Sequence, residues 1–171
     1  MTRGPLAPML ALALGGCVAT PAPIAPPIPT AAAPRFDPLA FFTGDLEGKG
    51  RLKKAFSRTE DTLVERRGRM DGGVLHLTQV IHEGSKPART REWTMRQVAP
   101  GRYTGTLTDA KGPMSVETQG NRLHIAFTMK GGFPTEQWLT LSPDGTRAHN
   151  VMTVRKSGLR LAVLVEDIWK R

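Results

Sequence analysis

Four histidines are the first side chains in this sequence that suggest chemistry, because an imidazole can ligate a metal or transfer a proton. His76 and His82 share one face of a predicted strand, but six residues of extended chain separate them by ~20 Å. His124 and His149 lie on two other predicted strands, each close to an arginine. No cluster has the spacing of a zinc site or a facial triad, so the sequence predicts no metal site.

The serines and carboxylates give no clearer sign of catalysis. The Gly-x-Ser-x-Gly pattern that holds a hydrolase nucleophile on a sharp turn does not occur in the sequence. Carboxylates such as Glu47, Glu65 and Glu117 alternate with basic residues, which is typical of exposed strand faces. The sequence therefore identifies no catalytic residue and no cofactor, although a pair assembled across two strands would leave no local motif.

The single cysteine, Cys17, has a more specific context. Arg3 precedes an apolar stretch at 6–14 that is too short to span a bilayer as a permanent helix. The sequence Leu-Gly-Gly-Cys at 14–17 resembles the lipobox of bacterial lipoproteins, in which the cysteine sulfur receives a diacylglycerol. The alternative is a cysteine that follows an ordinary signal peptide by coincidence and is buried in the fold.

The lipobox interpretation predicts how the protein is processed and where it resides. Residues 1–16 would be removed as a signal peptide, and Cys17 would become an acylated N-terminus carrying acyl groups such as palmitate. Each methylene in the bilayer contributes about 0.8 kcal/mol, so several acyl groups hold a protein firmly. Val18 is not the aspartate that retains some lipoproteins in the inner membrane, which favours the outer membrane facing the periplasm.

A proline- and alanine-rich stretch follows, and residues 17–35 are expected to form a tether. Six prolines favour an extended polyproline conformation, at about 3.1 Å per residue, which would hold a domain some tens of ångströms from the membrane. The folded body is expected at 36–171. With Cys17 acylated, this body can form no internal disulfide and must be stabilised by packing alone.

The body has the pattern of an all-β protein. Asp37 before Pro38 predicts one short N-terminal helical turn, and apolar residues then alternate with polar ones in many short segments. One such segment, GLRLAVLVEDIW, places Val163 and Val165 on its apolar face. Glycine-rich turns separate about nine or ten strands, which predicts an antiparallel meander closed as a barrel. A two-sheet sandwich is the alternative.

Three segments of the body suggest a family: FDPLAFFTGDLEGKG, REWTMRQVAPGRYTGTLTDAKG and HNVMTVRKSGLRLAVLVEDIWKR. Together they resemble the uncharacterised bacterial lipoproteins known as domain of unknown function 3833, over almost all of 36–171. The strand LHLTQVIHEG departs from the acidic and aromatic character that the family has at this place. If this strand lines a ligand site, the ligand is expected to differ from that of the family. The resemblance implies a lipid-anchored β-protein and no activity. Its matching positions are Phe41, Phe42, Gly44, Arg91, Trp93, Tyr103, Gly105, Trp138, Asn150, Lys156 and Gly158.

Charge narrows the choice of partners. The 171-residue protein has a formal net charge of +9, and 36–171 holds 22 Lys and Arg residues against 15 Asp and Glu, a difference of +7. Runs such as Arg66-Arg67-Gly68-Arg69 are expected to be solvated. No nucleic-acid recognition module is visible and the predicted location is outside the cytoplasm, so nucleic acid is not an expected partner. Anionic surfaces of the cell envelope fit better.

Two hypotheses of different class follow for the body. In the first, a lipocalin-like barrel holds an apolar or amphiphilic, lipid-like molecule, with Trp93, Tyr103, Met129 and Trp138 as the candidate lining residues. In the second, the protein is a structural or interaction lipoprotein of the envelope with a filled core, and those four residues only pack. An eight-stranded barrel can be filled or can hold a small ligand, so the size of the domain does not decide between them.

Overall fold

The computed structural model describes residues 18–171, so Cys17 and the predicted signal peptide at 1–16 lie outside the described residues. The described residues form one short helix and ten strands, and none of them belongs to a helix long and apolar enough to cross a membrane. The elements are α1 (Pro38–Phe42), β1 (Gly44–Lys54), β2 (Thr59–Asp71), β3 (Val74–Glu83), β4 (Arg89–Ala99), β5 (Arg102–Leu107), β6 (Met114–Gln119), β7 (Arg122–Met129), β8 (Phe133–Leu141), β9 (Arg147–Lys156) and β10 (Leu159–Lys170).

All ten strands belong to one closed barrel in which each strand pairs antiparallel with its neighbours in the sequence. The barrel closes between β1 and β10, where Leu46 lies opposite Lys170 and Lys54 lies opposite Ala162. The predicted all-β, antiparallel barrel with a short N-terminal helix is therefore confirmed, and the sandwich alternative is wrong. Within residues 18–171, closure gives each of the ten strands a partner on both sides, so the sheet has no edge strand that could pair with another protein.

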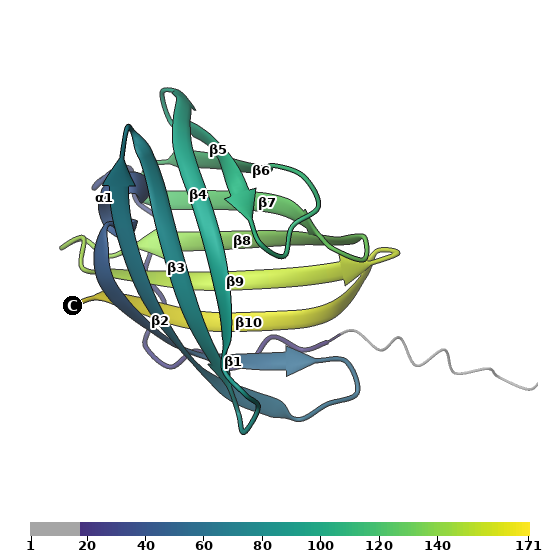
Figure 1. Cartoon of the computed structure of the whole chain (residues 1–171). Helices are drawn as coiled ribbons and strands as arrows, with labels where there is room; N and C mark the ends of the chain where they lie inside the picture. The colour runs from purple at the N-terminus through teal and green to yellow at the C-terminus, as the bar shows by residue number, and fades with distance from the viewer. Residues whose placement is uncertain (1–17) are drawn as a thin grey trace, which may run out of the picture.

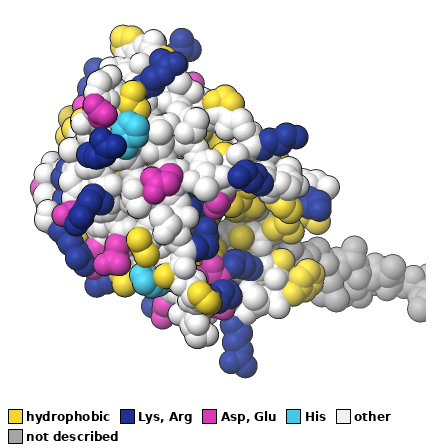
Figure 2. All heavy atoms as spheres, in the orientation of Figure 1, with side chains coloured by type: hydrophobic (Ala, Val, Ile, Leu, Met, Phe, Trp, Pro, Cys, Tyr) yellow, Lys and Arg dark blue, Asp and Glu magenta, His cyan; other side chains and the backbone are white. Residues whose placement is uncertain are grey.

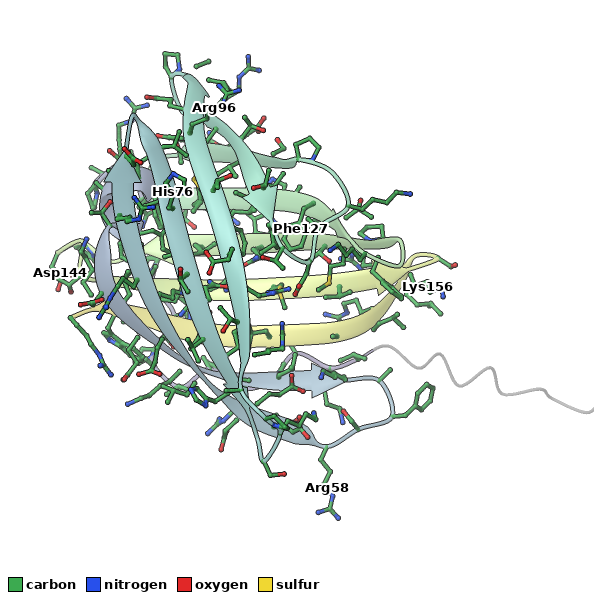
Figure 3. All side chains as sticks on the ribbon, in the orientation of Figure 1. Arg58, His76, Arg96, Phe127, Asp144 and Lys156 are labelled. Atoms are coloured by element: carbon green, nitrogen blue, oxygen red, sulfur yellow. The ribbon has the colours of Figure 1, made fainter. Side chains whose placement is uncertain are left out.

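The barrel has two different ends because successive hairpins alternate in direction (Figure 1). We call the end that holds α1 and the C-terminus the plug end. The opposite end carries the β1–β2 and β9–β10 hairpins, and we call it the open end. In Figure 3, Asp144 marks the plug end and Lys156 marks the open end.

The helix α1 fills the plug end. Asp37 caps it by accepting hydrogen bonds from the backbone N–H groups of Leu39 and Ala40 at 3.0 and 3.1 Å. Phe41 and Phe42 then pack edge to face, with ring centroids 5.1 Å apart, inside an apolar core built by inward-facing residues of most strands. The half of the barrel next to α1 is thus occupied by side chains.

The apolar face predicted for the last strand, with Val163 and Val165, points out of the barrel and not into its interior. Inward-facing residues of β10 are Leu164, Glu166 and Ile168, whereas Val163 and Val165 face outward. The register between β10 and β9 shifts between Arg160 and Ala162. Val163 and Val165 are nevertheless buried, because Val18 from the N-terminal segment covers them together with Ala55 and Val151.

The proline-rich segment at 18–35 lies along the outside of the barrel. The backbone N–H of Ala25 donates to Asp167 Oδ2 at 3.3 Å, and Arg147 Nη2 donates to the carbonyl of Pro26 at 3.1 Å. Further along, Asn121 Oδ1 accepts from the N–H of Ala31 at 2.7 Å. This arrangement corrects the prediction of a spacer, because residues 18–35 are held on the barrel rather than extended away from it.

Asn121 forms three hydrogen bonds with this segment, and removal of its side chain provides a test. Its amide also donates to the carbonyls of Pro29 and Leu141 at 3.0 and 2.9 Å, and the residue is only 2% exposed. We expect Asn121→Ala to lower the free energy of unfolding by about 2–3 kcal/mol, because buried groups lose their partners. Urea denaturation measures this, with the exposed Gln119→Ala as the control. Hydrogen exchange at Ala31 should accelerate in the first variant only.

Candidate functional site

A buried ion pair crosses the interior of the barrel. Arg66 on β2 and Glu166 on β10 both face inward, and Arg66 Nη2 donates to the two carboxylate oxygens of Glu166 at 2.7 and 2.8 Å. The two side chains are 5% and 1% exposed. Charges taken out of water must be paired and hydrogen-bonded to persist, and this pair meets that requirement.

The strand between these two partners has no side chain at the crossing point. β1 lies between β10 and β2 in the barrel, and its inward-facing residue at this level is Gly48. A Cβ at Gly48 would lie 2.1 Å from Glu166 Oε1 and 2.3 Å from Arg66 Nη1. Glycine at this position therefore provides the space in which the guanidinium and the carboxylate meet.

Uncharged polar side chains extend the ion pair into a layer across the barrel. Asn150 Nδ2 lies 3.3 Å from both Glu166 Oε2 and Gln137 Oε1. On the facing strands, Trp93 Nε1 donates to Gln79 Oε1 at 2.8 Å. This polar layer separates the apolar plug half from the open half of the barrel.

Two further charged clusters border the interior toward the open end. Arg91 on β4 donates to Asp109, which also accepts from Arg89 at 3.3 Å. Burial lowers the pKa of the Arg91 guanidinium, while the hydrogen bond to Asp109 opposes that shift.

Glu83 at the end of β3 is the centre of the second cluster and accepts from Lys54 and from Lys86. Burial by itself raises the pKa of Glu83, but the hydrogen bonds from the two lysines outweigh burial and lower that pKa to about 2. Its carboxylate is therefore charged throughout the physiological range and fixes two cations at the open end.

Two cavities lie on either side of the polar layer. The volume in which the centre of a water molecule fits is about 20 Å³ in the deeper cavity and about 60 Å³ in the cavity toward the open end. Both are bordered by Arg66, Gln79, Trp93, Gln137 and Asn150. The open-end cavity is also lined by Leu52, Thr62, Val64, Ile81, Glu83, Arg89, Arg91, Met152, Leu164 and Glu166.

Four polar atoms of this lining have no hydrogen-bond partner among residues 18–171. They are Thr62 Oγ1, Arg66 Nε, Arg91 Nη2 and Asn150 Oδ1. Buried polar atoms normally have a partner, either in the protein or in a bound molecule. Three of the four can donate a hydrogen bond and two can accept one, so the open-end cavity suits a small group rich in acceptors, such as a carboxylate or a phosphate.

Comparison with known proteins assigns the sequence to a family. A family model described as "Protein of unknown function (DUF3833)" matches residues 12–166. The chain belongs to this family. No curated protein matches the sequence.

Two solved structures show the same fold as this DUF3833 protein. The S-type phycobiliprotein lyase CPES from Guillardia theta superposes with a TM-score of 0.60 at 4% identity, covering 78% of this chain and 90% of that one. The protein Rv2717c from M. tuberculosis superposes with a TM-score of 0.55 at 14% identity, covering 80% of this chain and 99% of that one. At such low identity the likeness concerns the fold alone.

The four candidate lining residues fall in different places in the DUF3833 barrel. Trp93 lines both cavities. Tyr103 packs in the apolar core near the plug end, whereas Met129 packs against the same core at the open end of β7; neither borders the two cavities.

Trp138 lies on the outer surface of the barrel and is 39% exposed. It stacks on His124, with ring centroids 4.0 Å apart, and the guanidinium of Arg122 lies over its ring. Trp138 therefore does not line the interior, and the prediction that it does is wrong. Along a strand, odd and even positions face opposite sides, and Trp138 is one residue from the inward-facing Gln137.

Sequence reasoning missed most of the polar lining. Arg66 belongs to a run of arginines expected to be solvated, but its alternation with the inward-facing Val64 on β2 places it inside. Glu166 stands in an apolar strand, where a lone carboxylate could have indicated a buried partner. Three residues that carry the resemblance to the family, Arg91, Trp93 and Asn150, all border the open-end cavity.

The ion pair can be tested by removing one charge and then both. Glu166→Gln keeps the shape of the side chain but leaves Arg66 charged and unpaired, so we expect the free energy of unfolding to fall by about 3–5 kcal/mol. The double variant Arg66→Met/Glu166→Leu removes both charges, and its stability should return to within about 1 kcal/mol of the parent or exceed it. Urea denaturation measures both. Equal losses in the single and double variants would contradict this account.

Proposed function

We propose that this DUF3833 protein binds a small amphiphilic molecule in the open-end cavity of its barrel. The observation that carries the proposal is the set of unpartnered polar atoms in that cavity, on Thr62, Arg66, Arg91 and Asn150. Thr62 Oγ1, Arg66 Nε and Arg91 Nη2 would donate to the acceptor-rich head of the ligand, whereas Asn150 Oδ1 can only accept and would not contact it. A carboxylate or phosphate there would satisfy the donors of Arg66 and Arg91 that residues 18–171 leave without a partner.

The rest of the lining supports an apolar tail. Leu52, Ile81, Met152 and Leu164 border the same cavity, beside Trp93. Each water molecule needs about 10–15 Å³ of the volume given above, so the cavity holds about four to six of them. The same number of molecules occupies roughly 120–180 Å³ in liquid water. A short amphiphile with a single tail matches this space, whereas a two-tailed phospholipid exceeds it. The similar fold of a protein named as a phycobiliprotein lyase also supports a functional rather than only structural role for such a barrel.

We propose further that the protein is a lipoprotein of the bacterial cell envelope. The Leu-Gly-Gly before Cys17 and the apolar stretch at 6–14 support cleavage after residue 16 and acylation of Cys17. Val18 in place of aspartate supports the outer membrane, with the barrel in the periplasm. Without Arg3, residues 17–171 have 23 Lys and Arg against 15 Asp and Glu, and the difference of +8 suits anionic lipid surfaces.

Ligand binding can be followed through Trp93. In a protein that begins at Val18, with Trp138→Phe and Trp169→Phe, Trp93 is the only tryptophan and it borders both cavities. We expect sodium butanoate to change its fluorescence with saturation at one site. Thr62→Val should weaken binding about 5–10-fold, since one hydrogen bond of about 1 kcal/mol is lost.

The same substitution should not lower stability, because Thr62 Oγ1 has no partner within residues 18–171. A loss of affinity without a loss of stability distinguishes a ligand contact from a packing residue. Thr153→Val, at an outward-facing position opposite Val163, serves as the matched control and should leave affinity unchanged. The absence of saturable binding by butanoate, pentanoate and propyl phosphate would favour the alternative of a structural lipoprotein without a ligand.

The lipid anchor is tested in cells. Cys17→Ser removes the only thiol that can be acylated, so we expect the protein to lose the mass of the lipid and to leave the outer-membrane fraction. Intact-protein mass spectrometry and membrane fractionation measure the two effects. A Cys17→Ser protein that is still processed, acylated and recovered with the outer membrane would contradict the anchor.

A further inference from the structure

We infer that the open end of the barrel docks directly on a bilayer that contains anionic lipids, so that the cavity faces the membrane surface. The inference rests on the proposed acylation of Cys17 for its geometry, and it adds an orientation and a contact surface. The docking surface, which we call the rim, consists of the five hairpin regions at the open end: 53–60, 84–89, 108–113, 130–133 and 155–160.

The first observation is the place where the described residues begin. Val18 is buried against Val163 and Val165, next to Ala55 in the β1–β2 turn. Arg160 Nη1 donates to Thr20 Oγ1 at 3.3 Å, which attaches the same segment to the β9–β10 hairpin. Because Cys17 precedes Val18 directly, its acyl groups would enter the membrane beside the rim. One residue spans less than about 4 Å, so the barrel cannot stand far from the bilayer.

The second observation is the presence of exposed apolar residues on the rim. Phe56 at the β1–β2 turn is fully exposed and has a φ of +58°, a conformation that a bulky residue rarely adopts. Leu159, at the β9–β10 hairpin, is 53% exposed. A strained position that holds an exposed phenylalanine has no benefit for the fold, but an aromatic ring at this point could insert between lipid head groups.

The third observation is charge. The rim regions hold ten Lys and Arg residues and two Asp and Glu, a difference of +8. The plug-end regions 36–45, 69–74, 97–103, 117–122, 142–147 and 168–171 hold six and five, a difference of +1. Seven rim cations form no ion pair within residues 18–171: Lys53, Arg58, Lys111, Lys130, Arg155, Lys156 and Arg160.

Apolar tips surrounded by unpaired cations are the composition of a surface that binds anionic lipids. Figure 2 shows basic and apolar side chains together on the right of this face, beside the start of the described residues. The open-end cavity reaches the same end, since Glu83 and Arg89 flank the β3–β4 hairpin and line it. Docking by the rim therefore places the cavity where a short amphiphile could enter from the bilayer.

The orientation can be measured with a single label on the acylated full-length protein. Acylation of Cys17 leaves an introduced cysteine as the only free thiol. Four exposed apolar positions form a matched set: Phe56→Cys and Leu159→Cys at the rim, and Met70→Cys and Val98→Cys at the plug end. Each protein carries a nitrobenzoxadiazole label and is reconstituted in vesicles of phosphatidylethanolamine and phosphatidylglycerol.

We expect the two rim labels to show a blue shift, a several-fold rise in fluorescence and quenching by brominated lipids. The two plug-end labels should behave as they do in water. Rim labels that remain as water-exposed as those at positions 70 and 98 would overturn the inference. That outcome would also be expected if the rim bound a protein instead of lipid, because the vesicles contain lipid alone.

Whether Cys17 is acylated is determined separately, from the mass of the intact protein. If Cys17 proves not to be acylated, the four labels are measured in a Cys17→Ser background added to the same vesicles. The rim labels must still respond there, and less at high salt, or the inference is overturned. In that background Phe56→Gly should partition about ten-fold less, as expected for the loss of one buried aromatic side chain. Its melting temperature should not fall, because glycine tolerates the positive φ. A lower melting temperature with unchanged partitioning would contradict the role of Phe56.

Discussion

The pairing of Arg66 with Glu166 across the barrel interior imposes a constraint on much of the surrounding structure. Two charges can be held away from water only if each has partners in place, and here the partners come from several strands: Glu166 and Asn150 on β10 and β9, Arg66 on β2, and Gly48 on the strand between them. Arg66 and Glu166 can meet only in a closed barrel, because β1 lies between their strands and pairs with β10 at the point of closure. On its side of the barrel, the pair also separates the apolar lining near α1 from a mixed polar and apolar lining toward the open end.

The two halves serve different needs. In the plug half, Phe36, Phe41 and Phe42 occupy the space inside the barrel and supply apolar burial on which a domain without internal disulfides depends. In the open half, charged and polar residues line the cavity beside apolar ones, and four polar atoms are left without partners within residues 18–171. Buried polar atoms without a partner cost free energy, and that cost is the physical argument for a bound molecule in the cavity.

The N-terminal segment connects the interior to the surroundings of the protein. It covers the outward-facing valines of β10, bonds to Asp167 and Asn121, and then turns into α1 at the plug end. The segment thus starts at the open end and closes the opposite one. An anchor placed at its start would act on the open end, where the rim cations and Phe56 are found, so that anchoring, orientation and access to the cavity depend on one segment.

The sequence by itself determined the class of the fold, because alternation with a period of two and glycine-rich turns are local features. It also predicted the helical turn after Asp37, which rests on capping within three residues. It could not place Arg66 or Trp138 correctly. Arg66 stands in a run of charged residues and Trp138 stands between Gln137 and Leu139, and the side of the barrel to which each points depends on the register of the strand. Nor could it show that residues 18–35 lie on the barrel, since that packing depends on Val163, Val165 and Asn121, which are distant in the sequence. The cavity itself exists only in the tertiary structure, because its lining comes from strands β1–β4 and β8–β10 and acquires its polar character through contacts between them.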